Sequence, residues 1–175
     1  MKYLYAIVFS FLLFSCNQTN TTPVDEPEAD IEITTYYLIR HAEKDRTNPD
    51  DEDPNLDADG ILRAQNWAKI FSELDIDIIY SSNYKRTQQT ATPIAESKGF
   101  PVNTYDPHKV YDTDFFEITK GLSVLVVGHS NTVPVFANHV LQEQRYENIP
   151  DSIDGRLYVV TKMGNQASSF ILNLE

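Results

Sequence analysis

The sequence predicts an α/β fold, a three-layer sandwich in which a mostly parallel central sheet is flanked by helices. Short apolar runs that suit buried strands alternate along the chain with longer segments of helical periodicity. This alternation favours crossover connections, and therefore parallel pairing of the strands. The chain has 175 residues, which is enough for one domain of this kind.

The N-terminal segment is expected to lie outside the folded domain. Residues 1–15 carry one lysine followed by an apolar run, which is the pattern of a signal peptide. The sole cysteine, Cys16, follows directly, and Leu13-Phe14-Ser15-Cys16 resembles a bacterial lipobox. We therefore expect Cys16 to be lipidated, residues 16–31 to form a polar, acidic tether, and residues 32–175 to fold.

Composition limits the location and the partners of the protein. A lipidated Cys16 predicts an anchor in the cell envelope, facing the periplasm or the cell surface, and an unmodified one predicts a secreted protein. Which membrane and which leaflet would hold the anchor stay open. The net charge of −12 disfavours nucleic acid, because a phosphate backbone would be repelled. We expect a monomer.

The first predicted elements are a strand and a helix separated by a long loop. Residues 31–39 alternate and then become apolar, as in a strand that enters a sheet from an edge. Residues 44–60 form an acidic loop with two prolines. The apolar positions of residues 61–74 favour one side of a helix, which Asp57 or Asp59 can cap.

The middle of the domain repeats this order. Residues 76–82 suit a short buried strand, and residues 84–100 suit a second helix that Gly99 ends. Residues 101–106 give a weak strand signal.

The last third predicts three strands and one helix. Residues 123–130 form a strongly apolar strand and turn, and residues 131–144 form a third helix. Residues 155–162 and 167–175 are strands, expected to pair as a hairpin around Gly164.

Arginine and histidine recur where the predicted strands end. Arg40 and His41 end the first strand, Arg86 follows the second, and His129 ends the fourth. The carboxyl ends of parallel strands lie at one edge of a sheet, so these side chains could meet there. Arginine matches phosphate oxygens in pairs, and a neutral imidazole can attack phosphorus. Taken singly, Arg40 could simply pair with a loop acid and Arg86 could be solvated; four such residues at converging strand ends favour a phosphate site.

Three segments resemble the signatures of the histidine phosphatase superfamily, also called the phosphoglycerate mutase-like family: "LIRHAEK", "SSNYKRTQQTA" and "VVGHSNT". The stretch "NLDADGILRAQNWA" resembles the segment with the family's Leu, Gly and Gln, here Leu56, Gly60 and Gln65. The resemblance extends in the right order from Tyr36 to Asn131. It implies the phosphoglycerate mutase-like fold, and the length matches small phosphatase-type members.

The resemblance also implies roles for individual residues. His41 would be the nucleophile that carries the phosphoryl group as phosphohistidine, and Arg40, Arg86 and His129 would bind that group. Asn131 is a secondary candidate for a phosphate contact, or for capping the helix that follows. The implied enzyme is a metal-independent phosphoric monoester hydrolase with no cofactor, acting on a phosphorylated small molecule or a phosphoprotein.

The acid that protonates the leaving group is left open. Mutase-type members carry a Glu between the second arginine and the second histidine, and nothing matches it in the short interval here. Acid-phosphatase-type members carry an Asp after the second histidine, where this chain has Ser130. Glu43 is the preferred candidate, and Asp112, Asp114 and Glu117 are the alternatives. A phosphate-binding or phospholigand-binding lipoprotein without catalysis, or a mutase-type phosphotransferase, are the alternative functions.

The lipidation prediction can be tested on Cys16. In a bacterial host grown with labelled fatty acid, the full-length protein is expected to incorporate label, and Cys16→Ser is expected to incorporate none, because the thiol is the acceptor. Ser15→Ala is the control, and it should keep the label. Equal labelling of Cys16→Ser and the unaltered chain would contradict the prediction.

Overall fold

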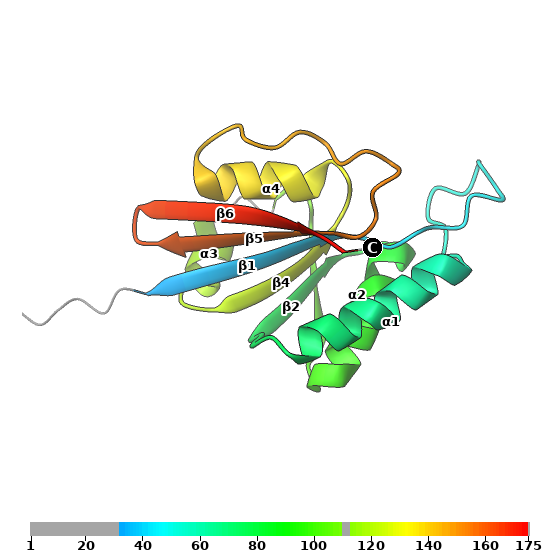
Figure 1. Cartoon of the computed structure of the whole chain (residues 1–175), viewed down its shortest axis with the longest axis horizontal. Helices are drawn as coiled ribbons and strands as arrows, with labels where there is room; N and C mark the ends of the chain where they lie inside the picture. The colour runs from blue at the N-terminus through cyan, green and yellow to red at the C-terminus, as the bar shows by residue number, and fades with distance from the viewer. Residues whose placement is uncertain (1–31, 110–112, 175) are drawn as a thin grey trace, which may run out of the picture. The chain divides into compact units, whose positions relative to one another are not determined.

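The computed structural model describes residues 32–109 and 113–174. The predictions for residues 1–31, Cys16 included, and for Asp112 lie outside these residues. In chain order the elements are β1 (Ile33–Arg40), α1 (Ala58–Ser72), β2 (Ile78–Ser82), α2 (Lys85–Lys98), β3 (Val102–Tyr105), α3 (Thr113–Ile118), β4 (Ser123–Gly128), α4 (Thr132–Leu141), β5 (Arg156–Met163) and β6 (Gln166–Asn173), as Figure 1 shows.

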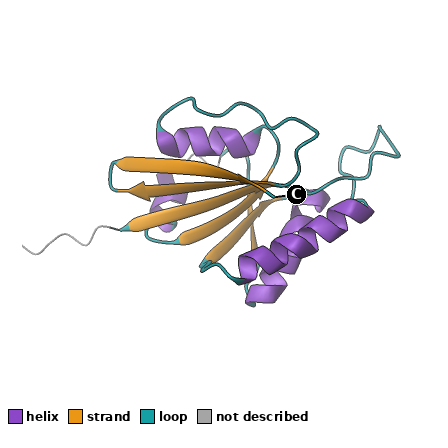
Figure 2. Cartoon of the chain, viewed as in Figure 1, coloured by secondary structure: helices purple, strands orange, loops and turns teal. Residues whose placement is uncertain are grey.

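The strands form one six-stranded sheet in the order β3-β2-β4-β1-β5-β6 (Figure 2). The first four of these strands pair parallel, and β5 runs antiparallel to both β1 and β6. The α/β class and the mostly parallel sheet are confirmed, and so is the pairing of the last two strands.

Helices cover both faces of the sheet, which completes the three layers (Figure 1). On one face, Trp67 and Phe71 of α1 pack with Ile94 of α2 against a cluster that includes Ile79 and Leu125. The other face buries residues of α3 and α4, among them Phe115 and Phe136, against Tyr36 and Val126. The Tyr36 and Phe136 rings meet edge to face, with centroids 5.1 Å apart, a favourable aromatic arrangement.

The register of β1 against β4 brings the first and third sequence motifs side by side. Arg40 lies opposite Gly128, and the His41 backbone N–H donates to the Gly128 carbonyl at 2.9 Å. A Cβ at Gly128 would lie 2.9 Å from both Thr132 Oγ1 and Tyr105 Oη, closer than real Cβ atoms come. Glycine therefore lets the turn after β4 close against its neighbours.

The start of α1 is fastened to the residues that follow the first motif. The Asp57 side chain accepts from the Gly60 backbone N–H at 2.8 Å, so Asp57 is the predicted cap. The Asp57 backbone N–H donates to the Glu43 carbonyl at 3.1 Å, and Lys44 and Leu56 form an isolated antiparallel bridge. The acidic loop is therefore closed at its base.

The sequence analysis missed α3, which lies in a stretch without strong periodicity. This helix has only six residues, too few to display a helical repeat. It is held by Phe115, which is buried, and by Phe116, which packs against the same cluster. Within residues 32–109 and 113–174, no helix has the length and apolar character needed to cross a bilayer.

Gly60 gives a test of how the first motif and α1 fit together. A Cβ at this position would overlap the Glu43 carbonyl oxygen, so backbone must move to admit it. Gly60→Ala is therefore expected to lower the free energy of unfolding by about 1–3 kcal/mol, the usual range for overpacking, in urea titrations. Asn66→Ala, on an exposed position of the same helix, is the control and should change it by less than about 0.5 kcal/mol. A Gly60→Ala protein as stable as the unaltered chain would show that the contact is not restrictive.

Candidate active site

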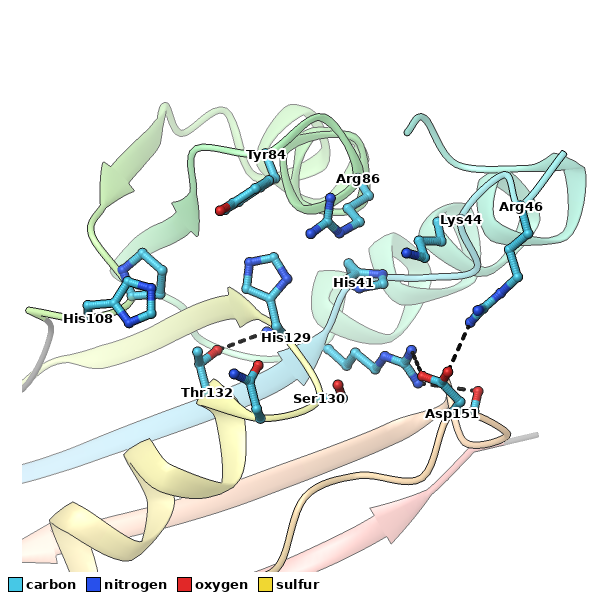
Figure 3. A pocket seen from close by; sticks show the side chains of 13 residues that line it. His41, Lys44, Arg46, Tyr84, Arg86, His108, His129, Ser130, Thr132 and Asp151 are labelled. Carbon is cyan, nitrogen blue, oxygen red and sulfur yellow. Dashed lines mark hydrogen bonds and ion pairs between the residues drawn. The ribbon is translucent and has the colours of Figure 1, made fainter. Parts of the chain in front are cut away.

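A polar cavity of about 280 Å³ opens where β1 and β4 end. Its lining brings together five site candidates of the sequence analysis, namely Arg40, His41, Arg86, His129 and Asn131. Figure 3 labels His41, Arg86 and His129 around the cavity. They come from separate parts of the chain, and the parallel strands place them together.

His41 is fixed in one tautomer by the backbone. Its Nδ1 lies 2.7 Å from the Ala42 carbonyl oxygen, which can only accept, so Nδ1 carries the hydrogen. The pKa of His41 is lowered to about 3, chiefly by burial and also by the charges of Arg40 and Arg86 and the ring of His129, against the opposing hydrogen bond to Ala42. The ring is therefore neutral at pH 7, with the lone pair on Nε2.

His129 faces His41 and is held by a buried hydroxyl. The two ring centroids are 5.5 Å apart, and His129 Nε2 lies 2.9 Å from Ser82 Oγ. Ser82 Oγ donates to Thr87 Oγ1 at 3.0 Å, so it accepts from His129 and leaves Nδ1 for a ligand. Burial, and then the charges of Arg86 and Arg40, lower the pKa of His129 to about 4.

Arg40 is buried and is held by the loop between α4 and β5. Its Nη2 pairs with Asp151 at 2.9 Å, and its Nη1 pairs with Asp154 at 3.2 Å. Nη1 also donates to the carbonyls of Pro150, Asp151 and Ile153 at 3.4, 3.4 and 3.3 Å. The pairing of Arg40 with loop acids is thus present, yet its buried Nε has no hydrogen-bond partner.

Arg86, at the start of α2, shows the same incomplete satisfaction. Its guanidinium lies over the Tyr84 ring, 4.5 Å from the centroid, and its Nη1 is 3.5 Å from Asp53 Oδ1. Its Nε is buried and also has no partner. An unsatisfied buried donor costs about 1–3 kcal/mol, so such donors are uncommon. Both arginines line the cavity, and their guanidinium charges favour an anionic ligand there.

Further cations lie at the cavity. Lys44 and Arg46 line it beyond His41, and His108 lies on the side of His129 (Figure 3). The sequence analysis did not assign Arg46, His108 or Tyr84 to the site, because they belong to loops and no periodicity predicts where loop side chains go. The cavity is cationic although the whole chain carries −12, so an anion would be attracted locally.

The structure does not bring the preferred acid, Glu43, to the cavity lining. Both Glu43 carboxylate oxygens accept from Arg63 Nε, at 2.7 and 2.9 Å. Burial raises the pKa of Glu43, but the hydrogen bonds and charge of Arg63 outweigh it, so the pKa lies below its usual value. A carboxylate held ionised on another arginine suits a structural role better than proton donation. Of the described alternatives, Asp114 and Glu117 do not line the cavity either.

Asn131 occupies the N-cap position of α4, but its side chain makes no capping hydrogen bond. The neighbouring hydroxyl, Thr132 Oγ1, instead accepts from the His129 backbone N–H at 3.0 Å. The Asn131 amide lines the cavity and is placed to contact a ligand. In the part of the chain that the structure describes, no three His, Cys, Asp or Glu side chains group as metal ligands do.

Comparison with known proteins agrees with this geometry. The family model described as the histidine phosphatase superfamily (branch 1) matches residues 36–107, which include the first two motifs. This part of the chain is therefore similar to members of the histidine phosphatase superfamily. A curated relative, phosphoserine phosphatase 1 of Hydrogenobacter thermophilus, is 41% identical over 75 residues. The match covers 40% of this chain and 35% of the relative, so it spans about a third of that protein.

Solved structures of phosphatases share the superfamily fold over most of this chain. The protein histidine phosphatase SixA, complexed with tungstate, covers 79% of this chain and 96% of its own, with a TM-score of 0.64 and 16% identity. A mycobacterial glucosyl-3-phosphoglycerate phosphatase covers 82% and 100%, with a TM-score of 0.62 and 11% identity. The α-ribazole phosphatase of Shigella flexneri covers 80% and 96%, with a TM-score of 0.59 and 16% identity. At these identities the likeness concerns the fold.

The lowered histidine pKa values predict how the site titrates. His41 and His129 should both remain neutral at pH 6 in the ligand-free protein, because burial moves their pKa values to about 3 and about 4. Nitrogen chemical shifts of the two imidazole rings, followed by NMR from pH 8 to pH 4, measure this directly. A ring that titrates near pH 6.5 would contradict the burial argument.

The same shifts predict a loss of stability in acid. In the unfolded chain His41 and His129 take up protons near pH 6.5, whereas in the folded protein they do so only near pH 4 and below. The free energy of unfolding should therefore fall as the pH drops from about 6.5 towards 4. His129→Gln should flatten this acid limb in urea titrations, whereas Asn66→Ala, at an exposed position without a titratable group, should not.

Proposed function

We propose that the protein is a phosphatase that hydrolyses phosphomonoesters through a phosphohistidine on His41 Nε2. One observation carries the proposal. The Ala42 carbonyl holds the hydrogen of His41 on Nδ1, so a neutral Nε2 lone pair adjoins a cavity that Arg40 and Arg86 also line. This arrangement combines a nucleophile with donors for the group that it attacks.

In the first step, the Nε2 lone pair of His41 attacks phosphorus and the bond to the ester oxygen breaks. Arg40 and Arg86 donate to the phosphoryl oxygens, on which the negative charge is spread. The bound dianion favours the charged form of the His129 ring, so that ring takes up a proton on Nδ1 when substrate binds and donates as well. The Ala42 carbonyl stabilises the positive charge that the ring gains. In the second step water attacks phosphorus, the N–P bond breaks, and phosphate leaves. These steps use side chains of the chain itself, so the proposal is a metal-independent hydrolase.

The cavity suits a compact phosphorylated group with additional negative charge. Its volume is about 280 Å³, at the lower end of small-molecule sites, and Lys44 and Arg46 add positive charge beyond the phosphate position. The curated relative is named a phosphoserine phosphatase, and SixA is a protein histidine phosphatase. Phosphoserine and phosphorylated peptides are therefore the first substrates to test.

A second candidate is a phosphate-binding protein without turnover. The placement of Glu43 on Arg63 favours it, because the acid that the sequence suggested does not reach the cavity. We also propose that the protein is lipid-anchored in the cell envelope through Cys16, a proposal that rests on the sequence alone.

The nucleophile assignment predicts the effect of His41→Ala. In full-length protein purified in mild detergent, phosphate release from phosphoserine, phosphopeptides and p-nitrophenyl phosphate should fall about 10³-fold or more, as when other nucleophiles are removed. His139→Ala, outside the cavity, is the matched control and should retain activity. The unaltered chain should also yield a trapped phosphoprotein whose phosphate is labile in acid and stable in base, as expected for phosphohistidine. His41→Ala should yield none. Phosphate binding without any turnover would instead support the binding protein.

A further inference from the structure

One carboxylate does reach the cavity, from a loop that no sequence motif marks. Among the described residues that line the cavity, Asp151 is the only acidic one. It lies between α4 and β5, with its side chain 72% exposed. Asp151 Oδ1 is 2.9 Å from Arg40 Nη2, and Oδ2 is 3.6 Å from Arg46 Nη2 (Figure 3).

The backbone holds this loop against the catalytic motifs. The Ile149 N–H donates to the Ser130 carbonyl at 2.9 Å, which ties the loop to the turn that carries His129. The Arg40 guanidinium donates to three carbonyls of the loop, those of Pro150, Asp151 and Ile153. The backbone around Asp151 is thus held both by Arg40 and by the turn after β4. This placement does not require any contact of the exposed Asp151 side chain.

Phosphoryl transfer from an alkyl ester needs a proton donor. The ester oxygen would otherwise leave as an alkoxide, which is a poor leaving group, so a positioned acid accelerates the step. We propose that Asp151 is the leaving-group acid of this site, a role that rests on the proposed phosphatase function.

The other carboxylates near the cavity are less suitable donors. Glu43 is occupied by Arg63, outside the cavity lining. Asp154 contacts the same Arg40 guanidinium as Asp151, and Asp53 contacts Arg86, but neither lines the cavity. Among the described carboxylates, only Asp151 combines contact with Arg40 and a place in the cavity lining.

A bound substrate changes the charges that surround Asp151. In the ligand-free protein its two carboxyl oxygens face Arg40 and Arg46, and Lys44 lies in the same cavity. A phosphoryl dianion that accepts from Arg40 places negative charge beside Asp151 and offsets these cations. Negative charge beside a carboxyl group opposes ionisation of that group, which suits a residue that carries a proton to the leaving oxygen.

The proposed step balances as follows. The His41 Nε2 lone pair forms the N–P bond, and the electrons of the breaking P–O bond go to the ester oxygen. That oxygen takes the proton of Asp151 and leaves as an alcohol, so Asp151 becomes a carboxylate. In the second step the Asp151 carboxylate takes a proton from the attacking water, and the N–P bond breaks to return the neutral His41.

Leaving-group dependence tests this role. Asp151→Asn in the full-length protein should lower kcat/KM about 100-fold for the best alkyl phosphate, within the range of about 10²–10⁴-fold for general acids, and less than about tenfold for p-nitrophenyl phosphate. The p-nitrophenolate ion leaves without protonation, so it does not need the acid. kcat/KM is the appropriate quantity because it reports only the steps up to the departure of the alcohol. Slow hydrolysis of phosphohistidine therefore does not affect it.

Asp154→Asn is the matched control, because it removes a carboxylate from the same guanidinium without removing one from the cavity. If Asp151 only positioned Arg40, Asp151→Asn would lower kcat/KM by the same factor for the alkyl phosphate and for p-nitrophenyl phosphate, as Asp154→Asn would. That result would overturn the proposal. Asp151→Glu retains an acid and should recover part of the alkyl phosphate activity, which also shows that the loop tolerates substitution.

The outcomes separate this proposal from the proposed function. An unaltered protein without turnover on any ester overturns the phosphatase function and the Asp151 role together. A different result would overturn the Asp151 role alone. In that case the unaltered protein is active, His41→Ala is inactive, and Asp151→Asn hydrolyses alkyl phosphates as fast as the unaltered protein, so the phosphatase function stands.

Discussion

The parallel pairing of β1 with β4 is the constraint on which the site depends. The hydrogen bond from the His41 N–H to the Gly128 carbonyl continues this ladder by one residue, and it fixes the two histidine rings 5.5 Å apart. A slip of one residue would turn the side chains of β1 to opposite faces and remove Arg40 from the cavity. The chemistry is therefore specified by sheet register, which the apolar core on both faces enforces.

Arg40 connects this register to the rest of the site. One part of its guanidinium holds the loop that carries Asp151, and its Nε remains a buried donor without an acceptor. Native proteins leave few buried donors unsatisfied, and those that persist are often at functional sites. Arg40 and Arg86 show the same pattern from two different elements, and both residues line the cavity, so incomplete hydrogen bonding accompanies both arginines of the site.

Those parts of the molecule that follow from local rules were predictable from the sequence. Buried strands and amphipathic helices have periodic patterns, and residues at the carboxyl ends of parallel strands converge, so Arg40, His41, Arg86 and His129 could be grouped in advance. Glu43 was assigned from its place in the motif, but only the folded chain shows that Arg63, one turn into α1, takes its carboxylate. Asp151 and Ser82 were missed because a loop conformation and a side-chain contact decide their roles.

The closed base of the acidic loop also has a consequence for how such a scaffold could diversify. The Lys44–Leu56 bridge and the Asp45–Asn55 hydrogen bond, 2.8 Å long, separate the loop interior from the strand end that carries His41. Lengthening a closed loop costs little, because the entropy of closure grows only with the logarithm of its length. Insertions between these anchors could reshape the wall beside Arg86 while leaving His41 in place, so the loop could vary in length and sequence without disturbing the strand end.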